Sequence, residues 1–226
     1  INPAAYTNVD QAEDEPELAF LINRDAPKVI AEKAREYNIP FIHFSTDYVF
    51  EGEKKVAYLE TDPTNPLGVY GASKWAGEEA IQHVGGKFYI FRTSWVYSNI
   101  GHNFYLTIKG LSEKRDEIRV ISDQFGVPTS SYFIAKHTQN IIKQLSSKNT
   151  GIYHLVPDGQ CSWCEFAKQI ITKTTPTFDI NNILPVDTDQ YPTNAKRPKS
   201  SVLDNSLIKT VFMLKFDDWI TELRKL

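Results

Sequence analysis

Hydrophobic and polar residues follow a helical period in some stretches of the chain and form short apolar runs in others. Residues 14–37 carry apolar side chains at helical spacing after an acidic start, and residues 69–84 repeat the spacing before two glycines. Both stretches are predicted to be helices, the first kinked or broken near Pro27. Residues 41–44 and 88–91 are short apolar runs bounded by turn-forming residues, which is typical of buried strands.

The order helix, strand, helix, strand indicates an α/β fold with a parallel sheet covered by helices, because both strands are apolar on both faces. Beyond residue 97 the pattern is less regular. We expect helices over 104–111, 132–145, 162–172, 205–213 and 216–226, strands over 118–121 and 152–156, and a turn-rich loop over 123–130. The C-terminal tail, with the helices expected over 162–172, 205–213 and 216–226, is predicted to cap a site rather than extend the sheet.

The composition is that of a folded protein, with 226 residues of which 41% are hydrophobic and 12% aromatic. The net charge of −3 comes from interspersed acids and bases, so no basic stripe suggests a nucleic-acid partner. No run approaches the ~20 apolar residues of a membrane span, and no signal peptide is visible, so we expect a cytoplasmic protein. Cys161 and Cys164 lack a second ligand pair for zinc and are predicted to be two reduced thiols at a helix start.

Candidate chemistry lies at the start of the helix expected over 69–84. Tyr70 and Lys74 are four residues apart, so their side chains emerge on one face. An ammonium beside a phenol favours the phenolate, and we expect it to lower the pKa of Tyr70. Ser45 and Thr46 follow the preceding strand, at the strand end where open α/β sheets bind ligands. Tyr and Lys at this spacing are common surface partners, so the pair indicates a catalytic site only in combination with the sequence segments around it.

Those surroundings consist of six segments that resemble, in the same order, segments of the dTDP-4-dehydrorhamnose reductases, a family of extended short-chain dehydrogenases. They are AAYTNVDQAE (4–13), STDYVF (45–50), ETDPTNPLGVYGASKWAGE (60–78), FRTSWVY (91–97), ISDQFGVPT (121–129) and YPTNAKRP (191–198). The resemblance implies a Rossmann-like doubly wound parallel sheet with a smaller C-terminal α+β substrate-binding lobe. Residues 1–98 and 130–156 would form the dinucleotide-binding part, and residues 99–129 and 157–226 the lobe.

The same resemblance implies roles for individual residues. Thr46 would supply a hydroxyl to the reacting oxygen, Tyr70 would donate a proton, and Lys74 would bind the nicotinamide ribose. Positions that match cofactor contacts are Ala4, Ala5, Tyr6, Asn23 and Ser45, with Tyr70 and Lys74. Positions that match substrate contacts are Val9, Asp10, Asp47, Tyr48, Trp95, Gln124 and Arg197, with Thr46. No residue is assigned as a metal ligand, and neither an interface Mg²⁺ nor a homodimer can be read from the sequence.

The implied activity is reduction of dTDP-4-dehydro-6-deoxy-L-mannose to dTDP-L-rhamnose with NADPH, or with NADH. One alternative is a sugar-nucleotide epimerase or dehydratase of the same superfamily. Dehydratases resemble one another in a TDE triplet, whereas Tyr48 follows Asp47 here. Another alternative is a non-catalytic regulatory subunit, against which the joint presence of Thr46, Tyr70 and Lys74 speaks.

Several of these residues have a purely structural alternative. Trp95 could belong to the core, and Asp10 and Asp47 could cap a helix or a turn. Gln124 and Arg197 could only hold loops in place. The five histidines occur at no ligand spacing and are predicted to be structural; they are His43, His83, His102, His137 and His154.

The sequence departs from the family at its beginning. The Gly-rich fingerprint between a first strand and a first helix is absent, and the spacing of Gly68, Gly71 and Gly77 does not match it. Ile1 would fall near the end of the family's fourth strand. We therefore expect this sequence to be the ordered or retained part of a longer polypeptide; the alternative is a genuine fragment that lacks the site for the cofactor pyrophosphate. The residue that distinguishes NADPH from NADH would lie in the absent region.

Overall fold

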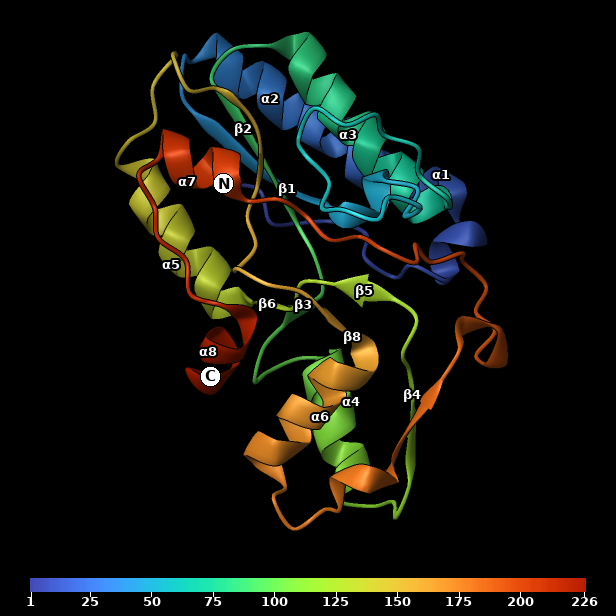
Figure 1. Ribbon diagram of the computed structural model, residues 1–226. Coiled ribbons are helices and arrows are strands. Elements are labelled where there is room, and N and C mark those ends of the chain that lie inside the picture. The colour runs from blue at the N-terminus through green and yellow to red at the C-terminus, as the bar shows by residue number, and fades with distance from the viewer.

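The computed structural model describes residues 1–226 and contains a parallel sheet with helices on both faces (Figure 1). The sheet has the order β1 (Phe41–Thr46), β2 (Phe88–Thr93), β7 (Gly151–His154). Thr46 pairs with Thr93 at one end of the register, so the carboxyl ends of β1 and β2 meet at one edge of the sheet. The predicted parallel sheet is thereby confirmed. None of the helices combines the length and apolarity needed to cross a bilayer.

Two groups of helices cover the two faces of the sheet (Figure 1). The first group is α1 (Pro16–Phe20), a π-helical turn (Leu21–Asp25), α2 (Ala26–Glu36) and α3 (Val69–Val84). On that face Ala31, Ala34 and Ile81 are buried and pack against Phe41 and Ile90 of the strands. The second group is α5 (Ser131–Ile142) and α7 (Ser206–Val211). Their Phe133, Ile141 and Ile208 pack with Tyr89 and Phe91.

The predicted break in the helix of residues 14–37 is confirmed, but it takes the form of a π-helical turn just before Pro27. Proline has no N–H, so the carbonyl of Asn23, four residues earlier, loses its normal helical donor. Gly77 of α3 packs against this carbonyl, where a Cβ would lie 2.1 Å from the oxygen of Asn23. The missing side chain therefore lets α3 approach the turn that carries Asn23.

A smaller lobe lies beyond the carboxyl edge of the sheet (Figure 1). It contains α4 (Phe104–Ser112), β4 (Ile118–Ile121), α6 (Trp163–Thr174), β9 (Ile183–Val186) and α8 (Trp219–Arg224). β4 and β9 pair in parallel, and Ile108, Phe166 and Leu223 are among the residues of a separate core. Two short pairs complete the strands: β3 (Val96–Tyr97) with β6 (Thr129–Ser130), and β5 (Phe125–Gly126) with β8 (Cys161–Ser162).

The elements with a clear local pattern match the prediction, and those made by pairing do not. α3 and β4 have the predicted bounds, whereas β9 and the two-residue strands were not expected. α7 contacts β7, so its segment belongs to the core of the sheet although the tail was expected to cap a site. Cys161 and Cys164 are free and buried, as predicted for reduced thiols.

Candidate active site

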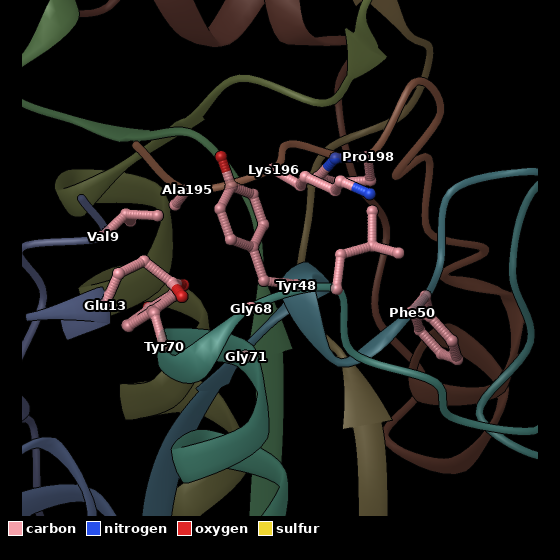
Figure 2. Close-up of a pocket in the computed structure, with 11 residues that line it drawn as sticks. Val9, Glu13, Tyr48, Phe50, Gly68, Tyr70, Gly71, Ala195, Lys196 and Pro198 are labelled. Atoms are coloured by element: carbon pink, nitrogen blue, oxygen red, sulfur yellow. The ribbon is translucent and has the colours of Figure 1, made fainter. Parts of the chain in front are cut away.

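The start of α3 is held in place by Glu13, a residue that the sequence analysis did not single out. The backbone N–H of Val69 donates to Glu13 Oε1 at 2.8 Å. Gly68, which precedes the helix, leaves no room for a side chain, because a Cβ there would lie 2.5 Å from the same oxygen. Figure 2 shows Glu13 beside Tyr70. A carboxylate at a helix N-terminus is favoured by the free N–H groups and by the helix dipole, and here it fixes the turn that carries Tyr70.

Thr46 and Tyr70 lie together at the carboxyl end of β1. Thr46 Oγ1 accepts from the N–H of Tyr48 at 3.2 Å and donates to Asp47 Oδ1 at 3.1 Å. The rings of Tyr48 and Tyr70 meet edge to face, 5.6 Å apart. Burial raises the pKa of Tyr70 to about 12, opposed by a hydrogen bond with Thr46 and reinforced by the charge of Asp47. Tyr70 therefore holds its proton at neutral pH and can act as an acid.

Lys74 is buried and its amine points at the backbone of β1. Nζ donates to the carbonyl oxygen of Phe44 at 2.6 Å and lies 3.2 Å from His43 Nε2. Burial lowers the pKa of Lys74 to about 8, and the charge of Glu78 opposes this. The expected lowering of the Tyr70 pKa by Lys74 is wrong, because the amine is directed at β1 and burial of the phenol dominates. The prediction considered the charge of Lys74 without knowing how deeply the Lys74 and Tyr70 side chains are buried.

Asp47 and a buried ion pair complete the electrostatics around α3. Burial raises the pKa of Asp47 to about 7, although hydrogen bonds from Ser201 and Thr46 oppose the shift. The N-cap of the turn 47–49 is Thr46, whose side chain accepts from the N–H of Tyr48. One turn beyond Lys74, Glu78 accepts from Arg92 of β2 through Nε at 3.0 Å and Nη2 at 2.6 Å.

Asn23 links the segment 4–6, which is expected to lie along the cofactor, to α3. The Asn23 side chain accepts from the N–H of Tyr6 at 2.9 Å and donates to the Tyr6 carbonyl at 3.0 Å. It also donates to Ser73 Oγ at 2.9 Å. Ala4 and Ala5, which precede Tyr6, keep part of their surface exposed. Asn23 therefore positions the segment 4–6 through its backbone, with its own amide fully engaged.

Asp10 and Arg197 form an ion pair between the N-terminal segment and the loop before the last helices. Arg197 Nη2 donates to Asp10 Oδ2 at 2.7 Å and Nη1 donates to Oδ1 at 3.1 Å. Asp10 makes no helix cap with its side chain, so that alternative is wrong. The pair brings residues 195–198 over a small pocket of about 10 Å³. Figure 2 shows Val9 and Glu13 on one side of this pocket, Lys196 and Pro198 on another, and Tyr48 between them.

Trp95 has a strained backbone with φ of 47° and is stacked on Trp163, with the ring centroids 3.5 Å apart. Gly126 makes room for it, because a Cβ there would lie 2.4 Å from the indole. Trp95 is only partly buried, at the border of the core of the small lobe. Left-handed backbone at a bulky residue is costly and is concentrated at functional sites, which favours a binding role over a core role.

A larger cavity of about 270 Å³ lies in the small lobe. Its lining includes Phe104, Trp163 and Arg119, together with Gln124 and Arg197, which were both expected to contact substrate. Gln124 also donates to Thr188 Oγ1 at 3.1 Å. Aromatic faces and two guanidinium groups around one cavity suit a planar ring joined to an anion.

The structure thus brings the predicted residues into two groups and adds several that the sequence did not indicate. Thr46, Asp47, Tyr48, Tyr70 and Lys74 form the first group, and Gln124 and Arg197 border the cavity of the second. The unexpected residues are His43, Glu13, Glu78, Arg92 and Trp163. For His43 a signal existed: a polar residue in the middle of the apolar run FIHF is costly to bury unless it has partners.

Comparisons with known proteins show which family this chain resembles. The chain matches the RmlD substrate binding domain family over residues 1–226. The dTDP-4-dehydrorhamnose reductase of Escherichia coli (strain K12) is 42% identical over 224 residues, which cover 97% of this chain and 75% of that protein. That of Burkholderia thailandensis is 39% identical over 230 residues, covering 97% and 77%. The chain therefore spans about three quarters of the length of these relatives.

Solved structures show the same relationship. A Bacillus anthracis dTDP-4-dehydrorhamnose reductase in complex with NADP superimposes with a TM-score of 0.92 at 36% identity, covering 99% of this chain and 77% of that one. A dTDP-glucose 4,6-dehydratase from Streptomyces venezuelae shares the fold, with a TM-score of 0.79 at 15% identity, 98% of this chain and 69% of that chain. By sequence and by structure, the chain belongs to the dTDP-4-dehydrorhamnose reductase family.

Proposed function

We propose that the protein reduces the C4 keto group of dTDP-4-dehydro-6-deoxy-L-mannose (dTDP-4-dehydrorhamnose) with NADPH, yielding dTDP-L-rhamnose. The observation that carries this proposal is the position of Tyr70 beside Thr46 at the carboxyl end of β1, where burial favours the protonated phenol. Membership in the reductase family and the NADP complex of the B. anthracis relative support it. A cytoplasmic location stays a prediction.

The residues at the carboxyl edge of the sheet fit a nicotinamide cofactor. Ser45 Oγ and Thr93 Oγ1 are buried there without a hydrogen-bond partner, and a buried orphan hydroxyl is costly unless a ligand meets it. Lys74 uses two of its three N–H groups within the protein and has one left for a ribose hydroxyl. When bound, NADPH supplies the hydride. The segment 4–6, held by Asn23, offers backbone along which the cofactor would lie.

Tyr70 supplies the proton and Thr46 orients the oxygen that receives it. Because burial keeps the pKa of Tyr70 near 12, its Oη retains the proton until an oxygen with developing negative charge is presented to it. Thr46 Oγ1 donates to Asp47 in the structure, so holding the sugar oxygen requires its hydrogen to turn from Asp47 toward the substrate. Both groups stabilise charge that appears only during the reaction.

The cavity of about 270 Å³ in the small lobe is the proposed nucleotide site. Phe104 and Trp163 offer aromatic faces to the base, and Arg119 and Arg197 offer N–H groups to the diphosphate. Arg197 keeps donors in reserve, because its contacts with Asp10 and the Ala195 carbonyl use only part of its five N–H groups. Trp95 is stacked on Trp163, which lines this cavity, and is the proposed contact to the sugar.

The test is a reaction of the purified protein with dTDP-4-dehydrorhamnose and NADPH. We expect loss of nicotinamide absorbance and formation of dTDP-L-rhamnose, identified by NMR. Tyr70→Phe should bind NADPH normally and slow turnover by about 100-fold or more, the range for a general acid. Tyr97→Phe is the matched control, because the Tyr97 ring is buried in the core of the small lobe against Tyr105 and Phe166. A folded protein that consumes no NADPH, or a product changed by epimerisation or elimination, would contradict the proposal.

A further inference from the structure

His43 lies in the middle of β1 and is completely buried. Its Nε2 is 3.2 Å from Lys74 Nζ, and its Nδ1 is 3.2 Å from the side-chain amide of Asn2. The ring of Phe41 is stacked 6.1 Å away. Both ring nitrogens therefore face a polar side chain from a different part of the chain, α3 on one side and the N-terminal segment on the other.

The surroundings of His43 favour the neutral imidazole. Burial and the charge of Lys74 hold the pKa of His43 well below its ordinary value, and a hydrogen bond with the backbone of Asn2 opposes this. Lys74 is the charged group that faces the ring, with Glu78 as the acid next to Lys74 on α3, and Asn2 is uncharged. A neutral imidazole has one acceptor nitrogen and one N–H.

We propose that His43 is a positioning residue for Lys74, with Nε2 accepting one N–H of the buried ammonium. The carbonyl of Phe44 accepts a second N–H, so both groups come from adjacent residues of one rigid strand. The third N–H is then directed away from β1, toward the ribose of the cofactor. This inference rests on the proposed function only in that last step, because the contact between His43 and Lys74 exists in the protein alone.

The arrangement determines the tautomer of His43. An ammonium can only donate, so Nε2 must be the acceptor and the ring proton must be on Nδ1. Nδ1–H then needs an acceptor, whereas in the structure Nδ2 of Asn2 faces Nδ1 and the amide oxygen accepts from the N–H of Ala4 at 3.2 Å. A half-turn of the Asn2 amide supplies that acceptor at the cost of the hydrogen bond from Ala4. His43 thus connects Asn2, at the beginning of the chain, to Lys74 on α3.

Two substitutions separate positioning from packing. In His43→Gln the side-chain amide occupies the position of Nε2 and can accept a hydrogen bond from Lys74. In His43→Asn the shorter side chain places its amide at the position of Nδ1, where it faces Asn2 and does not contact Lys74. Both remove the ring, so their effects on folding should be similar. We expect His43→Asn to weaken NADPH binding by about tenfold or more, the size of a lost hydrogen bond to a charged group, and His43→Gln to retain binding within about threefold.

Binding is measured by NADPH fluorescence with the purified protein, and thermal unfolding reports the cost to stability. Equal NADPH affinities of the two variants, whether both normal or both lost, would overturn the inference. The ¹⁵N spectrum of histidine-labelled protein at pH 6.5 gives a readout that needs no cofactor. The signal missing from His43→Gln should show protonated Nδ1 and unprotonated Nε2; the opposite tautomer, or a charged ring, would also overturn the inference. Absence of keto-sugar reduction by the unmodified protein would instead contradict the proposed function.

Discussion

The pH dependence of NADPH binding tests whether Lys74 or Tyr70 titrates near neutrality. Burial lowers the pKa of Lys74 to about 8 and raises that of Tyr70 to about 12. The charged fraction of Lys74 thus falls about tenfold for each pH unit above 8, while Tyr70 keeps its proton throughout. If the ammonium holds the ribose, the association constant for NADPH should fall over the same range.

The magnitude of the loss is limited by the value of the interaction itself. A hydrogen bond from a charged group contributes about 1.5–3 kcal/mol, so the association constant should fall by about 10- to 100-fold between pH 7 and 10 and then level off. Fluorescence titration of NADPH at constant ionic strength measures this without any turnover. The midpoint should lie near the pKa of the free protein, about 8.

Tyr70→Phe provides the decisive comparison. Because the titrating group is Lys74, the variant should show the same loss of affinity with the same midpoint. Affinity that stays constant up to pH 10 would refute the role of the buried ammonium. A midpoint that disappears in Tyr70→Phe would show that the phenol titrates there, contrary to the effect of its burial.

Two further predictions concern stability. Gly77→Ala should lower the free energy of unfolding by about 1–3 kcal/mol, because its Cβ would lie 2.1 Å from the Asn23 carbonyl oxygen. Gly110→Ala, with nothing within 4 Å, should raise it by up to about 1 kcal/mol; equal effects in urea unfolding would contradict this. Burial raises the pKa of Asp47 from 3.8 to about 7, so between these pH values the folded state keeps a proton that the unfolded state releases. The free energy of unfolding should therefore fall by about 4 kcal/mol as the pH rises from the lower pKa to the higher one. Asp47→Asn should remove this slope, and an unchanged slope in urea unfolding from pH 4 to 8 would contradict the assignment.

The parts of the fold that the sequence predicted are those determined by near neighbours. α3 has the predicted bounds because its apolar spacing and the glycines after Val84 act within a few turns. The π-helical turn could be located only roughly from Pro27, since its form depends on how Gly77 packs against Asn23. β9 was missed because a strand of four residues exists here through its pairing with β4.

The candidate site divides in the same way. The spacing of Tyr70 and Lys74 and the position of Thr46 at a strand end indicated candidate groups, and the six family-like segments gave those groups their weight. The contact of His43 with Lys74 could not be predicted, because these residues are 31 positions apart and no local pattern relates them. The direction of the Tyr70 pKa shift was predicted wrongly for a similar reason: the spacing showed a nearby cation but not the depth of burial.

The sequence by itself therefore determined the longer helices, the main parallel strands and their order, and it indicated the candidate groups of the site, because helical period, turn residues and motif spacing are local properties of the chain. Only the tertiary structure decided which side chains are shielded from water, which hydrogen bonds they make and which protonation state their surroundings favour. Those properties depend on solvent exclusion by residues far apart in the chain, such as Asn2 and Lys74 on the two sides of His43.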